Sequence, residues 1–518
     1  MADKSSNPEH ATRNSEPFLR LTSARISQLI FLIAFLVLFV YTDYRGQDEI
    51  SVAVNSFFRA NPLVVVTYLL AVKGFTMLLF PGIVTIVFSA ILGRFFCGWI
   101  CPLGTLIDLT TSRIRKTKPL TFLKGNFKYY LLFALLFAAL FNVNAAGIFD
   151  PIAILLRFLT FFLYPLFGYT ARSGWVGLYE LLGDNRDVLN VPYGFLKTYL
   201  LPFRETLYPL AFFSLIFFLF IFFLERYERR NWCRNLCPLG TLLGLIGSFS
   251  LTRRTPLKLC GDCGDCRQHC PTAFDEELFQ KQDCILCMDC KIKCRFQRVN
   301  FRLKPALPKA PPFSTSRRVV LGGLASGFIL SRVFAFKPVH AASRPLRPPG
   351  VNEEGTFLAK CVRCGECMKV CPRNALYPAT LETGLYGLFT PVLVPRLGYC
   401  EYNCNLCGQV CPTGAIPQLP VQRKQKAIIG LAVVDKNHCL PYAKKLNCIV
   451  CEEHCPIPDK AIRFETVEDM DYNGKKVTLQ RPYVMDELCN GCGICEYVCP
   501  LEEKAAIEVF PKVKRKIK

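Results

Sequence analysis

The chain has 518 residues, which is enough for several domains. Hydrophobic residues make up 51% of it, a share that suggests that part of the chain lies in a membrane. The formal net charge of +23 gathers in loops beside apolar segments, without interleaved aromatic residues, so we attribute it to membrane topology and exclude nucleic-acid binding. The 28 cysteines are too regularly spaced, in too long a chain, for a disulfide-stapled secreted domain.

Four apolar segments follow a polar tail, residues 1–25, which lacks the apolar core and cleavage site of a signal peptide. Each segment can cross a bilayer as a helix, and their bounds are Ile26–Tyr41, Pro62–Leu92, Tyr130–Ile148 and Tyr208–Leu224. The second is broken by Lys73-Gly74 and Pro81-Gly82, which predicts a kink or a span followed by a re-entrant piece. We therefore predict an α-helical membrane domain with four spans over residues 26–252.

The loops between these segments differ in charge, and this difference predicts the orientation. Basic residues crowd the loop between the second and third segments and the loop after the fourth, whereas the loop between the first and second segments has few. The positive-inside rule then places the N-terminus and both basic loops in the cytoplasm. Residues 149–206 become an outer loop, whose apolar piece Ile152–Tyr164 is expected to lie flat on the membrane or against the bundle.

Two copies of the motif Cys-x3-Cys-Pro-Leu-Gly-Thr lie within the membrane domain, each after an apolar span. Their thiols are Cys97, Cys101, Cys233 and Cys237. The repeat suggests two membrane halves that bring the two motifs together. Three interpretations stay open: a dithiol redox relay in the catalytic path, a jointly ligated metal centre, or tight turns that pack the helix ends while the thiols stay inert.

Residues 253–303 carry two runs of the bacterial two-cluster ferredoxin pattern, Cys-x2-Cys-x2-Cys-x3-Cys. Three closely spaced thiolates hold one [4Fe–4S] cluster and the fourth reaches the neighbouring cluster. The expected ligand sets are Cys260, Cys263, Cys266 with Cys294, and Cys284, Cys287, Cys290 with Cys270. Zinc sites also use four thiolates, but the three-residue gap and the following Pro271 argue against zinc.

A linker over residues 304–318 leads into a fifth apolar stretch, Val319–Phe336. At the end of the linker, Ser316-Arg317-Arg318, followed by Leu321, fits a twin-arginine export signal. The alternative is a chance arginine pair in an interdomain linker. Because clusters are inserted in the cytoplasm, a cluster-bearing domain must cross the membrane folded, as twin-arginine transport permits. We therefore predict a connecting fifth transmembrane helix over residues 319–336, with residues 337–518 outside.

Residues 337–518 carry four further cysteine runs. The first and fourth runs have the standard spacing, and the second and third have longer gaps, which indicates a loop inserted between ligands rather than a missing ligand. The cysteines are Cys361, Cys364, Cys367, Cys371, Cys400, Cys404, Cys407, Cys411, Cys439, Cys448, Cys451, Cys455, Cys489, Cys492, Cys495 and Cys499. We expect four clusters here, six in the chain, and two ferredoxin-like α+β modules. We predict nested pairing, the first run with the fourth and the second with the third.

Other redox groups lack a binding pattern in this sequence. It has no Cys-x-x-Cys-His motif, and none of its five histidines lies in a predicted span, so we exclude haem. It has no Walker motif and no dinucleotide fingerprint, so we exclude flavin. We therefore expect a chain that conducts electrons rather than one that transforms a soluble substrate.

Residues 1–303 resemble the NapH-type membrane ferredoxins, and residues 316–518 resemble the NapG/MauM-type four-cluster ferredoxins. Beyond the cysteine runs, the supporting stretches are Arg347-Pro-Pro-Gly, Leu446-Asn-Cys-Ile-Val-Cys, Asp459-Lys-Ala-Ile and Lys504-Ala-Ala-Ile. Together the two likenesses cover nearly the whole chain, as in a NapH–NapG fusion. The run that begins at Cys400 departs from NapG spacing and resembles the MauM-like branch.

The resemblance implies a multi-pass quinol dehydrogenase of the bacterial inner membrane, with the two-cluster module in the cytoplasm and the four-cluster module in the periplasm. Menaquinol or ubiquinol from the membrane quinone pool would be oxidised, and electrons would leave through the clusters to a periplasmic reductase or a c-type cytochrome. Lys73, Arg94 and Asp108 are candidate groups at the quinol site, because ionisable residues at membrane depth are costly; snorkelling to the interface is the alternative.

Two further functions stay open from the sequence. One is electron delivery for the maturation or activation of a metal cofactor in another protein, and the other is electron input from a low-potential donor to quinone. A purely structural anchor is disfavoured, because six clusters exceed what the stability of the fold needs.

Overall fold

The computed structural model describes residues 22–50, 52–111, 127–182, 187–256, 270–272, 283–292, 294, 299–303, 317–335, 345–470 and 474–511. Of the predicted features, the tail up to residue 21, most of the linker with Ser316, and the ligands Cys260, Cys263 and Cys266 lie outside the described residues.

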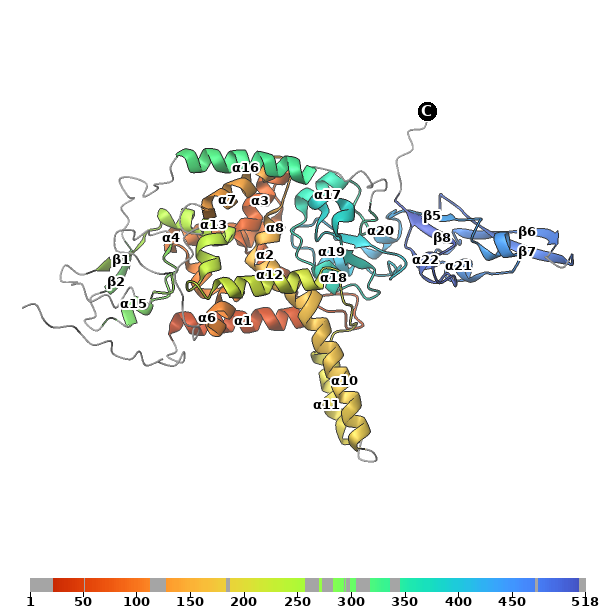
Figure 1. Ribbon diagram of the computed structural model, residues 1–518, viewed down its shortest axis with the longest axis horizontal. Coiled ribbons are helices and arrows are strands. Elements are labelled where there is room, and N and C mark those ends of the chain that lie inside the picture. The colour runs from red at the N-terminus through yellow and green to blue at the C-terminus, as the bar shows by residue number, and fades with distance from the viewer. Residues whose placement is uncertain are drawn as a thin grey trace, which may run out of the picture.

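Three parts follow one another along the long axis of the molecule (Figure 1). A helical domain lies in the middle, a small two-cluster module with β1, β2 and α15 at one end, and the four-cluster module at the other. The helices of the middle part are α1 (Ser23–Tyr41), α2 (Asn55–Arg59), α3 (Pro62–Val72), α4 (Phe80–Leu92), α5 (Phe95–Trp99), α6 (Pro102–Thr111), α7 (Phe127–Leu140), α8 (Ala146–Phe149), α9 (Pro151–Phe158), α10 (Tyr164–Leu182), α11 (Asp187–Tyr199), α12 (Ala211–Leu224), α13 (Pro238–Ser248) and α16 (Arg317–Ala335).

The described strands form four two-stranded antiparallel sheets, one in the two-cluster module and three in the four-cluster module. The elements of the two-cluster module are β1 (Thr252–Pro256), α15 (Asp289–Ile292) and β2 (Val299–Leu303). Those of the four-cluster module are α17 (Glu354–Lys360), α18 (Glu366–Lys369), β3 (Leu376–Pro378), β4 (Pro391–Leu393), α19 (Leu406–Gln409), α20 (Val421–Gln425), β5 (Leu431–Val434), α21 (Val450–Glu453), β6 (Ile462–Met470), β7 (Lys476–Val484), α22 (Ile494–Tyr497) and β8 (Ile507–Phe510). Strands β6 and β7 form the far tip of the molecule (Figure 1).

A buried polar pair fixes two helix starts of the middle part against each other. The Asn61 side chain caps α3 by accepting from the Leu63 N–H, and the Asp150 carboxylate caps α9 by accepting from the Ala153 N–H at 3.0 Å. Asn61 Nδ2 also donates to Asp150 Oδ1 at 2.6 Å. The two caps therefore satisfy helix-end donors and each other, which allows both groups to be fully buried.

Among the described residues, two helices are long and apolar enough to cross a membrane. They are Ser23–Tyr41, which matches the first predicted span, and the continuous helix Pro151–Leu181, which contains a π-helical turn. The other predicted spans appear, over the part of the chain that is described, as shorter helices of 11 to 14 residues, so four full-length spans are not observed there. The predicted break in the second segment is confirmed, because α3 ends at Lys73 in a left-handed conformation and α4 begins at Phe80.

The predicted outer loop also contains more regular structure than expected. Its apolar piece belongs to Pro151–Leu181, and most of the apolar window of that helix is buried inside the structure. Of the two arrangements expected for this piece, packing against the bundle is the one observed. Beyond it, α10 and α11 form a helical hairpin that projects away from the long axis (Figure 1). The hairpin exposes large apolar side chains, including Leu181, Val191 and Phe195.

Helix α16 takes the place of the predicted fifth span and packs along α7 (Figure 1). The contact depends on small residues: a Cβ at Gly323 would lie 2.7 Å from Phe133 Cβ, and one at Gly327 would lie 2.9 Å from the Ala134 carbonyl oxygen. Glycines spaced by four residues let two helix backbones approach closely. The outer faces of the domain remain apolar, with Ile30 on α1 and Ile216 on α12 more than half exposed.

Candidate iron–sulfur sites

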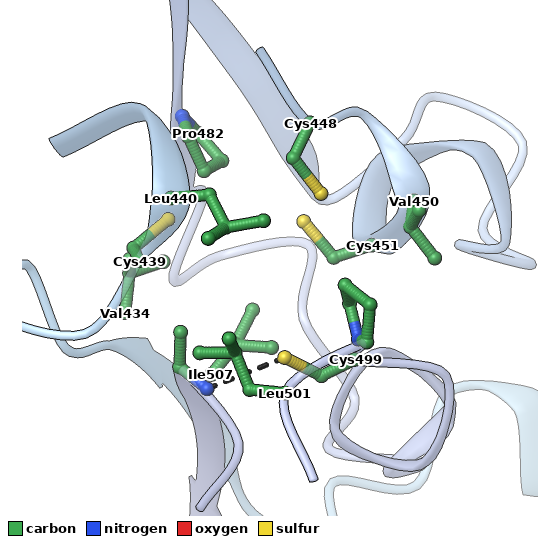
Figure 2. Close-up of a pocket in the computed structure, with 12 residues that line it drawn as sticks. Val434, Cys439, Leu440, Cys448, Val450, Cys451, Pro482, Cys499, Leu501 and Ile507 are labelled. Carbon is green, nitrogen blue, oxygen red and sulfur yellow. Dashed lines mark hydrogen bonds between the residues drawn. The ribbon is translucent and has the colours of Figure 1, made fainter. Parts of the chain in front are cut away.

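Four cysteines face a common space near the tip of the four-cluster module (Figure 2). We define this as site D, formed by Cys439, Cys448 and Cys451 of the third run and Cys499 of the fourth. The rest of the lining is almost entirely apolar, and the pocket holds about 400 Å³ of space not filled by atoms. The Ala506 N–H donates to Cys499 Sγ at 3.3 Å, which aims a backbone dipole at the sulfur.

The chemistry of this donor set fits a [4Fe–4S] cluster. Burial raises the pKa of Cys439 to about 11 and that of Cys451 to about 12, so uncompensated thiolates are disfavoured in this apolar pocket. Iron ions would compensate the thiolate charge, which is the usual reason for four such thiols in one apolar pocket. Within the described part of the chain, no three His, Cys, Asp or Glu side chains lie close enough to hold a single metal ion.

Three further sites in this module have the same composition. Site A is formed by Cys361, Cys364, Cys367 and Cys411; site B by Cys400, Cys404, Cys407 and Cys371; site C by Cys489, Cys492, Cys495 and Cys455. In each site, three thiols come from one cysteine run and the fourth comes from another run. Burial raises the pKa of the three thiols of the same run, and the charge of the fourth thiol raises the pKa of its nearest neighbours further. Backbone N–H groups of Ala375 and Ile416 donate to Cys371 and Cys411 at 3.3 and 3.4 Å, as at site D.

The predicted nested pairing of the runs is wrong. The structure pairs the first run with the second and the third with the fourth, each pair exchanging its fourth cysteine. The reason is local: residues 376–393 fold back as the β3–β4 hairpin, and β5 pairs with β8, so consecutive runs face each other. The same sixteen cysteines form the four sites, and only their grouping differs from the prediction.

The four sites lie in the order A, B, C, D. Cys407 of site B is a neighbour of Cys367 of site A. The Cys400 N–H donates to the Cys492 carbonyl oxygen at 2.9 Å, which joins sites B and C. Cys451 of site D is a neighbour of Cys495 of site C. The line runs from the helical domain towards the tip formed by β6 and β7 (Figure 1).

Buried cations hold site A and site B against the helical domain. Arg157 of α9 donates to the Gly147 and Arg363 carbonyl oxygens at 2.8 and 3.1 Å, and Arg363 donates to the Asn144 carbonyl oxygen. Lys369 donates to the Thr42 carbonyl oxygen at 2.9 Å. All three side chains are buried, so they add positive charge beside sites where clusters would carry negative charge.

The described part of the two-cluster module agrees with its predicted crossing. Burial raises the pKa of Cys287, and Cys284 and Cys270 are among the groups that raise it further. Cys270 thus lies with the second run of this module, as predicted. Cys294 is described, but its three expected partners lie outside the described residues.

The Cys-x3-Cys-Pro motifs come together, as predicted from their repetition. Cys237 lies within electrostatic range of Cys97, Cys101 and Cys233, and all four thiols are buried. We call this group the paired motif. It lies at the ends of α5 and the π-helical turn Trp232–Leu236, immediately before α6 and α13.

The residues predicted for the quinol site, Lys73, Arg94 and Asp108, do not meet at one place in the structure. Lys73 is exposed at the end of α3. Asp108 instead forms an ion pair with Arg230, its Oδ2 lying 2.6 Å from Nη2. Arg94 donates to the Cys233 carbonyl oxygen and lies 3.6 Å from Asp283. Two of the three candidates therefore hold the paired motif and the two-cluster module in place.

A pocket that the sequence did not reveal lies between the helical domain and site B. It holds about 370 Å³ of space not filled by atoms, and its lining includes Asp43, Thr160, Tyr164, Lys369 and the site B ligand Cys371. Tyr164 OH donates to Asp43 Oδ2 at 3.1 Å. The lining comes from four distant segments, so no motif signals the pocket.

Comparisons with known proteins agree with these sites. A family described as "4Fe-4S binding domain" matches residues 74–121 and 208–256, each containing one copy of the paired motif, and a "4Fe-4S dicluster domain" matches residues 360–415, the first two runs of the four-cluster module. The ferredoxin-type protein NapG of Escherichia coli is 42% identical over 32% of this chain and 70% of the relative. The methylamine utilization ferredoxin-type protein MauM of Methylorubrum extorquens is 37% identical over 39% of this chain and 92% of the relative.

No solved structure matches the chain. The likeness to these relatives and the cysteine sites together identify the chain as an iron–sulfur protein of the electron-transfer type. The likeness spans only part of the chain. Over about two fifths of its length, the chain belongs to the NapG/MauM family of ferredoxin-type proteins.

Proposed function

We propose that this chain is a membrane-bound quinol dehydrogenase component that oxidises quinol and passes the electrons to an acceptor at the tip of the four-cluster module. The observation that carries the proposal is the line of sites A to D, which begins against the helical domain and ends far from it. Such a line suits a carrier that moves electrons away from a membrane. The acceptor would be a periplasmic reductase or a c-type cytochrome.

The outer surface of the helical domain supports a membrane location. Large apolar side chains are exposed along α1, α4 and α12, among them Ile33, Phe88 and Phe212. Water-soluble domains rarely expose contiguous apolar surface on this scale, whereas lipid makes it stable. The apolar helices and the arginine pair at the start of α16 agree with an inner-membrane protein that exports its four-cluster module.

The pocket beside Cys371 is the proposed quinol site. Polar groups from several elements converge on this pocket, as they do at small-molecule sites. Asp43 is buried and accepts hydrogen bonds from Tyr164 OH and from the Phe203 N–H, the latter at 3.3 Å. Thr160 Oγ1 is buried in the same lining without a hydrogen-bond partner among the described residues, so it is available to a ligand.

The chemistry requires that two protons and two electrons leave each quinol. Cys371, which lines the pocket, would help to hold a cluster at site B, and such a cluster would supply one-electron transfer. Asp43 is the group positioned to take each proton in turn, releasing the first to water before it takes the second, with Tyr164 orienting its carboxylate. Lys369, fixed by backbone carbonyl oxygens of the α1 end, places a positive charge where the quinol oxygen becomes negative.

The test is anaerobic reduction of the purified, cluster-loaded chain by a menaquinol analogue, followed by EPR. We expect [4Fe–4S]⁺ signals in the wild type and reduction at least about tenfold slower in Asp43→Asn, which removes the proton acceptor. The matched control is Asp48→Asn, an exposed carboxylate of the same loop, which should keep the wild-type rate. Dithionite should reduce all three proteins equally.

The outcomes separate the function from the site. If quinol reduces no cluster in the wild type while dithionite does, quinol oxidation is wrong and electrons run from a low-potential donor towards quinone. If quinol reduces the wild type and Asp43→Asn at the same rate, the function stands and the pocket is wrong.

A further inference from the structure

The paired motif is arranged about an approximate twofold relation between its two copies. In each copy an arginine precedes the first cysteine by three residues: Arg94 before Cys97, and Arg230 before Cys233. Arg230 Nη1 donates to the Cys97 carbonyl oxygen at 2.8 Å, and Arg94 Nη2 donates to the Cys233 carbonyl oxygen. Each arginine therefore anchors the cysteine of the other copy, and this exchange holds the four thiols together.

Glycine in each copy makes this exchange possible. A Cβ at Gly240 would collide with Arg94 Nη2 and lie 2.8 Å from the Cys233 carbonyl oxygen, and a Cβ at Gly104 would lie 3.2 Å from the Cys97 carbonyl oxygen. The Gly240 N–H also donates to Cys237 Sγ at 3.3 Å. The same kind of backbone bond to sulfur occurs at the described ferredoxin-type sites, as from Ala375 to Cys371.

Two fully buried guanidinium groups lie against these four buried thiols. Arg94 and Arg230 are 2% and 1% exposed, and Arg94 is also within hydrogen-bonding range of the Cys97 thiol. Each guanidinium has one carboxylate partner, Asp108 for Arg230 and Asp283 for Arg94, and directs further N–H donors at the cysteine segments. A [4Fe–4S] cluster with four thiolates carries a charge of about −2 when oxidised, which suits this surrounding.

The paired motif also lies between the two iron–sulfur modules. On one side, Trp99 Nε1 donates to the Leu286 carbonyl oxygen at 3.0 Å, next to Cys287 of the two-cluster module. On the other side, Cys101 is an electrostatic neighbour of Asp150, and Asp150 and Cys364 of site A are both neighbours of Arg157. Cys364 and the four thiols belong to one continuous apolar core.

We propose that Cys97, Cys101, Cys233 and Cys237 together ligate a seventh [4Fe–4S] cluster, which links the two-cluster module to site A. Each copy supplies only two thiols, so neither copy can hold the cluster alone. The cluster gains one electron as its neighbour on one side is oxidised, and loses one electron as its neighbour on the other side is reduced. The four thiolates remain ligands throughout, so no bond forms or breaks. The proposal is independent of quinol as the donor.

The test is the iron and acid-labile sulfide content of the full chain, purified anaerobically with its clusters. We expect about 28 irons and as many sulfides in the wild type, and about 24 of each in Cys97→Ala/Cys233→Ala. The matched control is Thr105→Val/Thr241→Val, which alters the same helix turns by removing hydroxyl bonds to the Cys101 and Cys237 carbonyl oxygens but keeps every thiol. The control should retain all the iron of the wild type.

Retention of about 24 irons by the cysteine variant would also show that its other sites remain folded. The proposal is overturned if the wild type and the cysteine variant hold equal iron and the four thiols are alkylated in the unfolded but unreduced wild type. It is also overturned if the variant loses a single iron and no sulfide, because the site would then be mononuclear.

Discussion

At the scale of single residues, the fourth cysteine of each run matters more than its position in the sequence suggests. Cys499 belongs to the fourth run but lines the pocket of Cys439, Cys448 and Cys451. Cys455 belongs to the third run but lies with the fourth. A cluster is therefore built from two segments, and losing a crossing cysteine affects the site of the other run.

This exchange predicts which cluster each cysteine variant loses. Cys499→Ser should remove or alter the same EPR signal as Cys439→Ser, because both thiols belong to site D. Cys455→Ser should instead match Cys489→Ser. Redox-titrated EPR of the four purified variants checks this. The grouping is contradicted if Cys499→Ser and Cys489→Ser affect one signal in common while Cys439→Ser affects another.

At the scale of elements, the close contact of α16 with α7 holds the connection between the two iron–sulfur modules against the helical domain. The contact is made by glycines whose missing side chains leave space for Phe133 and Phe137. Helices that meet through small residues are sensitive to added volume, because neither backbone can withdraw without losing packing along its whole length.

Enlarging the contact should therefore destabilise the chain. Gly327→Val places a branched side chain against Phe137 and the Ala134 carbonyl oxygen, and we expect a loss of about 1–3 kcal/mol of stability. Gly174→Val is the control, because a Cβ at this glycine of α10 would meet no atom within 4 Å. Thermal unfolding in detergent measures both. Equal unfolding temperatures for the two variants would mean that α16 does not pack tightly on α7.

At the scale of the whole molecule, the proposed quinol pocket lies at the four-cluster end of the helical domain, whereas the two-cluster module lies at the opposite end. Electrons from the pocket to site D would then stay on one side of a membrane. Electrons from the two-cluster module would cross it, through the paired motif. Only the second route is acted on by the transmembrane potential, which is worth about 2.3 kcal/mol per electron at 100 mV.

The two routes can therefore be separated in oriented proteoliposomes. Collapsing an imposed potential, negative on the side of the two-cluster module, should leave quinol-driven reduction of site D within about twofold. The same collapse should slow reduction of site D by a low-potential dye confined to the two-cluster side, because that electron loses the pull of the field. Time-resolved absorbance of the clusters measures both rates. Equal slowing of both reactions would contradict the position of the quinol pocket.

The sequence predicts the parts that depend on local spacing, and it fails where distant segments meet. The crossing of Cys270 in the two-cluster module follows from spacing alone and is confirmed. The nested pairing of the later runs fails because the β3–β4 hairpin brings consecutive runs face to face. No local pattern signals the partners of Asp108 and Arg94, because Arg230 and Asp283 are more than a hundred residues away from them.

The helical domain shows the same limit. A count of apolar residues predicts full spans, but α7 and α12 are only 14 residues long, because short apolar helices can pack on one another inside a bundle. The pocket between Asp43, Tyr164 and Lys369 could not be found in advance, since each residue taken alone is an ordinary surface or core residue of its own segment. Only tertiary packing places them together.

The hairpin of α10 and α11 has a mechanical consequence. It projects sideways from the long axis and exposes Leu181, Val191 and Phe195, so in the proposed setting it would lie on the lipid surface. A hairpin held on that surface would oppose tilting of the molecule. The long axis would then stay perpendicular to the membrane, with the β6–β7 tip at a constant distance from it. The height of the tip then selects acceptors by reach: a freely diffusing protein can meet it, whereas one lying low on the same membrane cannot.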